Sequence, residues 1–400
     1  MKTNIPFELT NVQRRYLGLS PVGDTWELVY VAKQYLYYDG NVIRKKITVN
    51  DDGSYYEAEL CEHTDQDRTV LLPKTKRGKP KKLNYTATLS FHPFGVYFSF
   101  SPHGVIIANY TTQTTFYYED FPAKLSMEEW LNRWIAETTE KDLEEMELYR
   151  NAKRQHIKYR EGDFFAFKIG RRKWGFGRIV LNIAELRKSE AFKAQKNYGL
   201  AQLMGKPLYI MVYRKMAENT DVDIDELALC ATLPVQSIMD NHFYYGEYRI
   251  IGNRPVMTNE WEPLISYGKS INGQDRRTVY LQYGLIFKET TTDKFNKYVI
   301  GSDGEFNPHR NESIGFVVNG YHMIEDLIAG HETNLTRKLL SSTDLRLPEN
   351  IDIKREIFTF FGLDADKSYA ENLKLAGKES LVTPFFDRIY RAEYTPSRNY

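Results

Sequence analysis

The side chains that most often carry out chemistry are thinly spread along this 400-residue chain. Metal-dependent hydrolysis needs His and carboxylate ligands gathered around one or two ions. The eight histidines instead occur singly, without HxH or HExxH spacing, at positions 63, 92, 103, 156, 242, 309, 322 and 331. His322 and His331 have Glu325 and Asp326 between them, but at this separation the two rings do not share one helical face. We therefore predict no metal site and no cofactor.

Nucleophilic catalysis would need a thiol or hydroxyl beside a base. Cys61 and His63 are two residues apart, and that spacing places two side chains on one face of a strand. Nothing nearby clearly supplies an orienting carboxylate or an oxyanion hole. No GxSxG elbow, dinucleotide fingerprint or P-loop spacing is present. Cys61 and the distant Cys230 are expected to be reduced and structural, so the sequence favours a binding protein over an enzyme.

Two basic clusters are the clearest candidates for binding. The first is a loop from 74 to 82 that contains Lys74, Lys76, Arg77, Lys79, Lys81 and Lys82. The second spans 168–178, where Lys and Arg are interleaved with aromatic rings. Positive charge beside aromatic rings suits nucleic acid, and it equally suits an acidic patch on a protein. A solvated loop whose charges deter edge pairing is the simpler interpretation of the first cluster.

The second cluster lies on a predicted hairpin. Its first arm, 162–169, is aromatic and β-branched after a Gly-Asp pair, residues 170–173 form the turn, and the second arm follows from Trp174. Gly175 and Gly177 share a face of the second arm, which predicts a bend or the close approach of a ring or backbone. We expect a sharply bent hairpin of the kind that forms the corner of a small barrel. Asp163 is expected to cap the turn that precedes the first arm, through a hydrogen bond from its side chain to the backbone.

Four motifs carry a resemblance to a known family. They are Tyr-x-x-Gly-Asp-x-Phe-Ala-Phe from Tyr159, Trp-Gly-Phe-Gly-Arg-Ile-Val from Trp174, Arg249–Pro255 and Val279–Gly284. Together they resemble immunity protein 26 of bacterial polymorphic toxin systems, a family in which some members carry a phosphotriesterase label. The resemblance spans about residues 156–288 and rests on structural motifs, which identify a fold more securely than an activity.

The resemblance implies a non-catalytic immunity-type protein that binds and neutralises a cognate toxin. The residues expected to contact this partner are Tyr159, Asp163, Arg171, Arg172, Lys173, Trp174, Phe176, Arg178, Tyr244 and Tyr245. Two alternatives stay open. One is nucleic-acid binding through the two basic clusters, and the other is a phosphotriesterase-like hydrolase.

The amino-acid composition and net charge limit which kinds of partner and cellular location are expected. The chain is 42% hydrophobic and 27% charged, as in a globular protein, and its net charge of +1 argues against a surface tuned for DNA or an anionic membrane. No run of about eighteen apolar residues and no signal-peptide pattern occurs, so we expect a cytoplasmic protein without membrane contact. The oligomeric state is not indicated.

The fold class expected is α+β in four parts. Residues 1–122 form an antiparallel β-rich domain, 123–155 a helical connector, 156–290 an α+β domain with a bent antiparallel sheet, and 291–400 a mixed, helix-rich region. The surest helix is 125–136, which opens with a capping box at Ser126 and has Trp130 and Trp134 at the spacing of core residues. A further helix is expected over 184–204, and others over 321–329 and 351–361.

Overall fold

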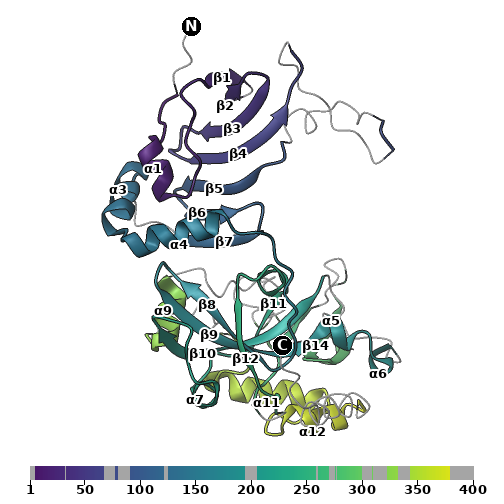
Figure 1. The fold of residues 1–400 in the computed structure, drawn as a ribbon. Coiled ribbons are helices and arrows are strands. Elements are labelled where there is room, and N and C mark those ends of the chain that lie inside the picture. The colour runs from purple at the N-terminus through teal and green to yellow at the C-terminus, as the bar shows by residue number, and fades with distance from the viewer. Residues whose placement is uncertain are drawn as a thin grey trace. The chain divides into compact units, whose positions relative to one another are not determined.

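The computed structural model describes residues 5–31, 33–66, 77–79, 91–120, 125–193, 205–257, 260–269, 275, 277–299, 309, 322–331 and 343–378. Antiparallel sheets combined with helices confirm the α+β class (Figure 1). The chain divides into two compact units. The N-terminal unit contains the described residues up to Ile157 together with Tyr245–Glu247, and the C-terminal unit contains most of the chain from Lys158 onward. The four-part division of the chain stays a prediction.

The N-terminal unit is built on one seven-stranded sheet in which each strand pairs with the next along the chain. Asp39-Gly40 and Asp52-Gly53 lie in turns between paired strands, and both glycines adopt the positive φ that such turns favour. The strands are β1 (Glu27–Val31), β2 (Gln34–Asp39), β3 (Val42–Val49), β4 (Tyr55–His63), β5 (Phe94–Ser101), β6 (Gly104–Asn109) and β7 (Thr114–Asp120).

Helices α1 (Asn11–Tyr16), α3 (Met127–Glu137) and α4 (Glu140–Arg150) belong to the same unit. The predicted capping box is confirmed, because the Ser126 hydroxyl accepts from the Glu129 N–H while the Glu129 carboxylate accepts from the Ser126 N–H. Trp130 is fully buried and stacks on Phe98 of the sheet at 5.6 Å. The tryptophans of α3 are therefore core residues, as predicted.

The predicted hairpin lies at the centre of the C-terminal unit. Its arms are β8 (Asp163–Ile169) and β9 (Lys173–Asn182), in a sheet of order β11-β10-β9-β8-β12. The other strands are β10 (Pro207–Ala217), β11 (Gln236–Met239) and β12 (Arg249–Asn253). Among the described strands none joins β11 to β12, so this sheet is open and the barrel expectation is wrong for this part of the chain.

The glycines of β9 permit close packing across the sheet, as predicted. A Cβ added at Gly177 would lie 2.3 Å from the Phe165 ring and 2.7 Å from the Met211 carbonyl oxygen. One added at Gly175 would lie 2.4 Å from the Phe167 ring. The β9–β10 pairing also contains two register shifts, which are typical of a bent strand.

Short helices follow strands β9, β10 and β11 along the chain. They are α5 (Ile183–Leu186), α6 (Glu190–Lys193), α7 (Ile224–Ala228) and α8 (Asn241–Tyr244). The single helix predicted over 184–204 is wrong in its described part, because the backbone turns between α5 and α6 and the Ser189 hydroxyl bonds the Leu186 carbonyl there. Residues 194–204 lie outside the described residues.

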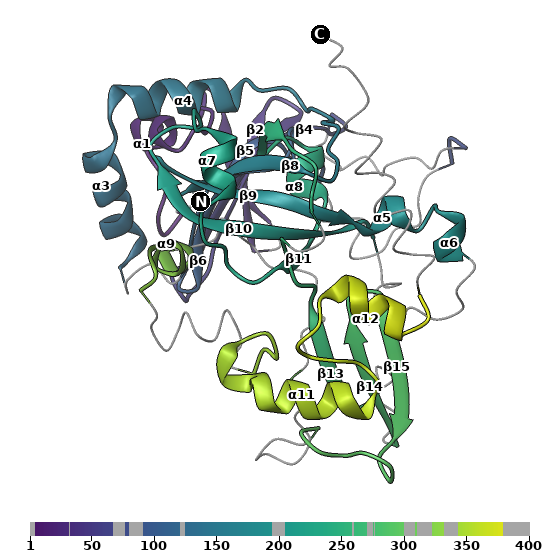
Figure 2. The same ribbon diagram turned by 90° about the horizontal axis from the view of Figure 1, so that it is seen from below.

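The C-terminal unit holds a second layer, a three-stranded sheet of β13 (Ile265–Lys269), β14 (Thr278–Tyr283) and β15 (Ile286–Thr291). A 3₁₀ turn, η2 (Pro348–Asn350), leads into α11 (Ile351–Phe360), and α11 and α12 (Tyr369–Leu375) cover the sheet (Figure 2). Leu281 of the sheet and Phe358 of α11 are fully buried in one shared core. The described helices of the C-terminal region thus cover one face of this three-stranded sheet.

Helix α9 (His322–Ala329) confirms the helix predicted there, and its Leu327 joins the core beneath β8 and β10. No helix within the described ranges is both long and apolar enough to span a membrane.

Candidate functional site

Three of the four sequence motifs meet at one buried arginine. Arg178 of β9 is 1% exposed, and its Nη1 donates to the Glu260 carboxylate at 2.9 Å. Its Nη2 donates to the carbonyl oxygens of Arg254 and Pro255, both at 2.6 Å, and its guanidinium lies 4.7 Å from the Phe164 ring centroid. Arg178 therefore organises the loop that follows β12, and we call this group of contacts the motif junction.

The start of β8 completes the motif junction. Asp163 is 5% exposed; its Oδ2 accepts from the Arg160 N–H at 2.7 Å and its Oδ1 from the Asn253 side chain at 2.7 Å. Burial raises the pKa of Asp163, although these hydrogen bonds and Arg160 oppose the shift. The predicted role of Asp163 in capping the turn before β8 is confirmed, since its carboxylate accepts a hydrogen bond from the Arg160 N–H three residues earlier. Gly162 precedes it at φ +86°, and a Cβ there would lie 2.3 Å from the Arg254 carbonyl oxygen.

These contacts place part of the expected partner-binding set inside the C-terminal unit. Asp163, Phe176 and Arg178 are all buried within the C-terminal unit, and Phe176 is fully enclosed by its core. Side chains in such positions hold the strands together and do not present a surface to another protein. Strand alternation alone does not reveal a sheet that is covered on both faces, so the sequence does not separate these three residues from the exposed ones.

Trp174 is also covered. Its ring is 6% exposed, with the Lys168 ammonium 5.1 Å and the Arg249 guanidinium 4.5 Å from the ring centroid. Cation–π contacts of this kind stabilise the packing of long basic side chains on an aromatic face. The ring of Trp174 is therefore covered by basic side chains of its own unit, and its partner-binding role stays a prediction.

The turn between β8 and β9 supplies the exposed part of the predicted set. Arg172 and Lys173 are exposed and Arg171 is half-buried. Lys173 forms an ion pair with Glu325 of α9, and the Lys168 ammonium donates to the Arg171 carbonyl oxygen at 2.8 Å. The turn therefore carries positive charge at the surface on a backbone that is fixed by its neighbours.

The predicted tyrosines fall into two groups. The Tyr159 hydroxyl donates to the buried Asp240 carboxylate, and burial together with that bond raises the pKa of Tyr159. Lys206 lies 5.4 Å from the Tyr244 ring centroid and 3.8 Å from Asp240, so Tyr159 and Tyr244 border one polar group. Tyr245 belongs to the N-terminal unit, where the Arg154 guanidinium lies 5.8 Å from its ring centroid. The predicted tyrosines are thus divided between the two units.

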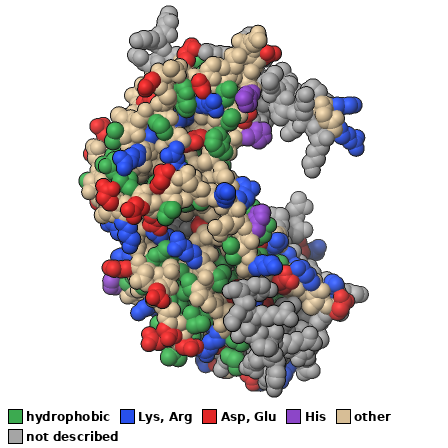
Figure 3. Space-filling view, in the orientation of Figure 1, with side chains coloured by type: hydrophobic (Ala, Val, Ile, Leu, Met, Phe, Trp, Pro, Cys, Tyr) green, Lys and Arg blue, Asp and Glu red, His purple; other side chains and the backbone are tan. Residues whose placement is uncertain are grey.

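The first basic cluster is only partly described. Arg77 and Lys79 are exposed, whereas Lys74, Lys76, Lys81 and Lys82 lie outside the described residues. On the face shown in Figure 3, Lys and Arg side chains are interspersed with Asp and Glu side chains. This mixture of charges agrees with the net charge of +1.

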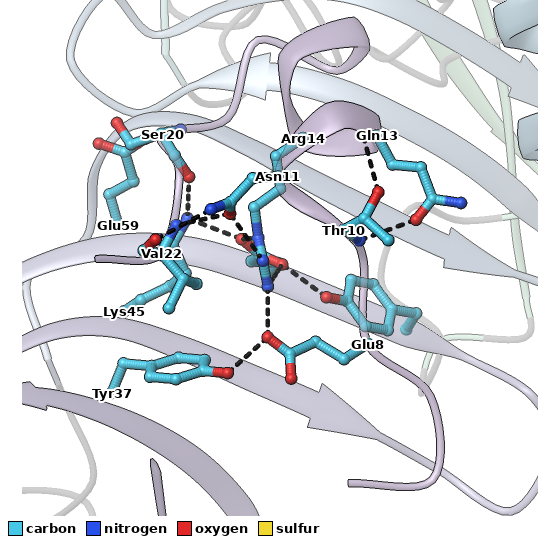
Figure 4. A network of polar contacts seen from close by, with 12 residues as sticks. Glu8, Thr10, Asn11, Gln13, Arg14, Ser20, Val22, Tyr37, Lys45 and Glu59 are labelled. Atoms are coloured by element: carbon cyan, nitrogen blue, oxygen red, sulfur yellow. Dashed lines mark hydrogen bonds and ion pairs between the residues drawn. The ribbon is translucent and has the colours of Figure 1, made fainter. Parts of the chain in front are cut away.

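A buried ionic network in the N-terminal unit was not predicted (Figure 4). Glu57 of β4 is fully buried and accepts from Arg14 Nε at 2.9 Å and from the Tyr55 hydroxyl, while Lys45 Nζ lies 2.7 Å from its Oε1. Burial alone would raise the pKa of Glu57, but Lys45 and Arg14 outweigh it and hold that pKa below its usual value. Arg14 reaches a second carboxylate, Glu8, at 2.9 Å.

The network is structural in character, because its charges balance and its donors have partners. Lys45 Nζ also donates to the Ser20 carbonyl oxygen at 2.8 Å, and the Tyr37 hydroxyl donates to Glu8. No sequence signal marked it: Arg14 and Glu57 are 43 residues apart, and isolated charged residues are usually exposed. It ties α1 to the inner face of the sheet.

The described residues contain no group of three or more His, Cys, Asp and Glu side chains placed to hold a metal ion. Exposed Cys61 has Arg44 at 3.9 Å, and exposed His331 lies 4.0 Å from Asp326. The Gln282 side chain, buried in β14, donates to the Gly284 carbonyl oxygen at 2.6 Å.

The motif junction and its hairpin identify a structural class, which is a bent antiparallel sheet. The motif residues of this sheet hold its strands and loops together, so they do not by themselves indicate an activity. Residues 160–277 match the family model of Immunity protein 26. The match confirms the resemblance over the hairpin, the motif junction and β13, and it ends just before β14. Neither a curated protein nor a solved structure matches the chain.

Proposed function

We propose that this protein is a cytoplasmic immunity protein that neutralises a bacterial toxin by binding it. The match of residues 160–277 to Immunity protein 26 carries the proposal, because that segment contains the whole central sheet of the C-terminal unit. The protein acts by occlusion, covering the toxin's working surface in a stoichiometric complex. Such complexes depend on a few well-placed aromatic and basic side chains.

The geometry narrows the binding residues within this proposal. Asp163, Phe176 and Arg178 fix the scaffold, so the contacts fall to those predicted residues that reach the surface. Arg172 and Lys173 extend from the β8–β9 turn, and Tyr159 and Tyr244 are half-buried beside Asp240. A rigid hairpin that displays basic residues loses little conformational freedom on binding, which favours affinity.

The test is a protection assay in bacteria. A toxin domain identified in the genes that neighbour this one is expressed with and without the full chain. The expected result is restored growth together with a complex that co-purifies at a 1:1 ratio. Charge reversal at Arg172→Glu and Lys173→Glu should abolish protection and leave folding intact. The matched control is Lys141→Glu, an exposed residue of α4 in the N-terminal unit, which should protect fully. Unchanged toxicity in the presence of the folded wild-type chain would overturn the proposal.

A further inference from the structure

Strand β1 is an edge of the seven-stranded sheet and carries two exposed apolar side chains. Tyr30 is 51% exposed and Val31 is 47% exposed. β1 pairs with β2 along one side, and within the described part of the chain no strand pairs along its other side. An exposed, regular and apolar edge strand is a template for pairing with another strand.

The register shows which backbone groups face outward from β1. Val31 pairs with Gln34 across a two-residue turn, and the residues that flank such a turn exchange hydrogen bonds with each other. Because bonding alternates along an antiparallel pair, Val29 and Glu27 also bond to β2. The N–H and C=O groups of Leu28 and Tyr30 therefore point away from the sheet.

The opposite edge of the same sheet is protected. The Thr115 N–H of β7 donates to the Glu247 carboxylate at 2.7 Å, and the β6–β7 pairing is interrupted by a register shift. β7 also ends in Glu119 and Asp120. β1 has no register shift, no Lys and no Pro, so it lacks the devices that usually deter edge pairing.

We propose that β1 pairs antiparallel with β1 of a second copy of this chain, about a two-fold axis at Val29. In this register Leu28 of one copy faces Tyr30 of the other, and their outward N–H and C=O groups form four hydrogen bonds across the axis. Glu27 faces Val31, and Val29 faces Val29, so no like charges are opposed. Two seven-stranded sheets become one continuous sheet.

The sequence ELVYV is self-complementary in this arrangement, which is why a second copy is the occupant proposed. The Tyr30 ring of each copy covers Leu28 of the other copy. Both Tyr30 rings therefore become more buried in the dimer than they are in the single chain. Five residues per strand make a small interface, so the dimer should be weak, with dissociation at roughly tens of micromolar. The inference is independent of the proposed toxin binding.

Sedimentation equilibrium of the full chain tests the dimer directly. The expected result is a concentration-dependent mass between monomer and dimer. Tyr30→Pro removes one outward N–H without removing a bond to β2, and it should leave a monomer at all concentrations. Tyr30→Thr is the control, because it removes the ring but keeps the N–H, and it should still associate. A wild-type monomer up to about 0.5 mM would overturn the proposal, since mass action then excludes even a weak pairing.

A second pair of variants keeps the test decisive if Tyr30→Pro does not fold. Val31→Lys places an ammonium opposite Glu27 of the other copy, and Val31→Glu places a like charge there. Because the pair occurs twice in the dimer, the dissociation constant should fall about tenfold for the lysine and rise about tenfold for the glutamate. Equal dissociation constants for the two variants would show that the copies associate through another surface.

Discussion

The two units each bury an arginine, and they satisfy it in different ways. Arg14 of the N-terminal unit bonds two carboxylates, Glu57 and Glu8, and shares Glu57 with Lys45. Arg178 of the C-terminal unit bonds one carboxylate, Glu260, and two backbone carbonyl oxygens. Arg14 is thus part of a charge-balanced network, whereas Arg178 mainly holds a loop in position.

The difference shows what each arginine contributes. A buried ion network stabilises only while it is complete, since losing one member leaves an uncompensated charge in a region of low dielectric constant. An arginine bound to carbonyl oxygens fixes the backbone instead, so its removal frees the segment that it holds. We therefore expect the N-terminal network to be the more sensitive to single substitutions.

Glu57→Gln should have the largest effect. It leaves Arg14 and Lys45 buried with one carboxylate between them, and the free energy of unfolding should fall by about 3–5 kcal/mol. Urea unfolding measures the loss, and hydrogen exchange should place it in β3 and β4. Glu8→Gln is the control and should cost about 1 kcal/mol, because Glu8 is 26% exposed and water can replace part of its bond. Equal losses for the two variants would contradict the ranking within this network.

Arg178→Met should follow, with a loss of about 2–3 kcal/mol. The carbonyl oxygens of Arg254 and Pro255 lose their donor, while Glu260 is 24% exposed and can be rehydrated. Faster hydrogen exchange should appear in β8, β9 and the loop after β12, with β3 and β4 unaffected. Arg172→Met at the exposed turn should change stability by less than about 0.5 kcal/mol. Exchange that also rises in the N-terminal sheet would refute the separate roles of the two arginines.

Gly177→Ala should cost about 2–3 kcal/mol, because its Cβ would overlap the Phe165 ring and the Met211 carbonyl oxygen. Gly170→Ala in the turn meets no atom within 4 Å, so only the strain of its positive φ remains, at about 1 kcal/mol. Thermal unfolding of the two variants separates packing from backbone strain. A smaller loss at Gly177 than at Gly170 would remove close packing as the reason for the glycine.

Acid titration should give the smallest effect and opposite signs in the two units. The pKa of Glu57 is lowered in the folded state, so its contribution is full above its usual value of 4.5 and is lost as pH falls through the folded pKa. The pKa of Asp163 is raised above its usual value of 3.8, so the folded state holds this proton more tightly than the unfolded state. The stability that Asp163 contributes is therefore lost as pH rises from 3.8 through the pKa of the folded state. Asp163→Asn should therefore gain stability relative to wild type as pH rises, whereas Glu57→Gln should lose it. Parallel pH profiles for the two variants would contradict this assignment.

The sequence predicted those features whose causes are local. The hairpin arms, the glycine contacts of β9, the capping box at Ser126 and helices α9 and α11 depend on residues within one turn or one strand pair. Helix α12 was missed, although Ser368 and Glu371 form a capping box that could have revealed it. The β1–β2 turn also gave no signal, because its described residue with positive φ is Lys33 and not Gly or Asn.

The candidate site was harder to predict because burial is decided by distant segments. Trp174 is enclosed by Arg249, and Arg178 is paired with Glu260, 82 residues further along the chain. The Arg14–Glu57 pair spans 43 residues. Charged and aromatic residues that alternate on a hairpin look the same in sequence whether their partners are solvent, another protein or a remote part of the same chain.

Tyr369 of α12 packs directly against Gly284, and this contact decides how short a fragment of the C-terminal unit can be. A Cβ at Gly284 would lie 2.6 Å from the Tyr369 hydroxyl, which also accepts the Leu285 N–H at 2.8 Å. A fragment cut at the ends of the family match would keep β13 but lose β14, β15 and the two helices over them. Ile265 and Tyr267 would then face water, so an excised domain has to include β14, β15, α11 and α12 to keep this core covered.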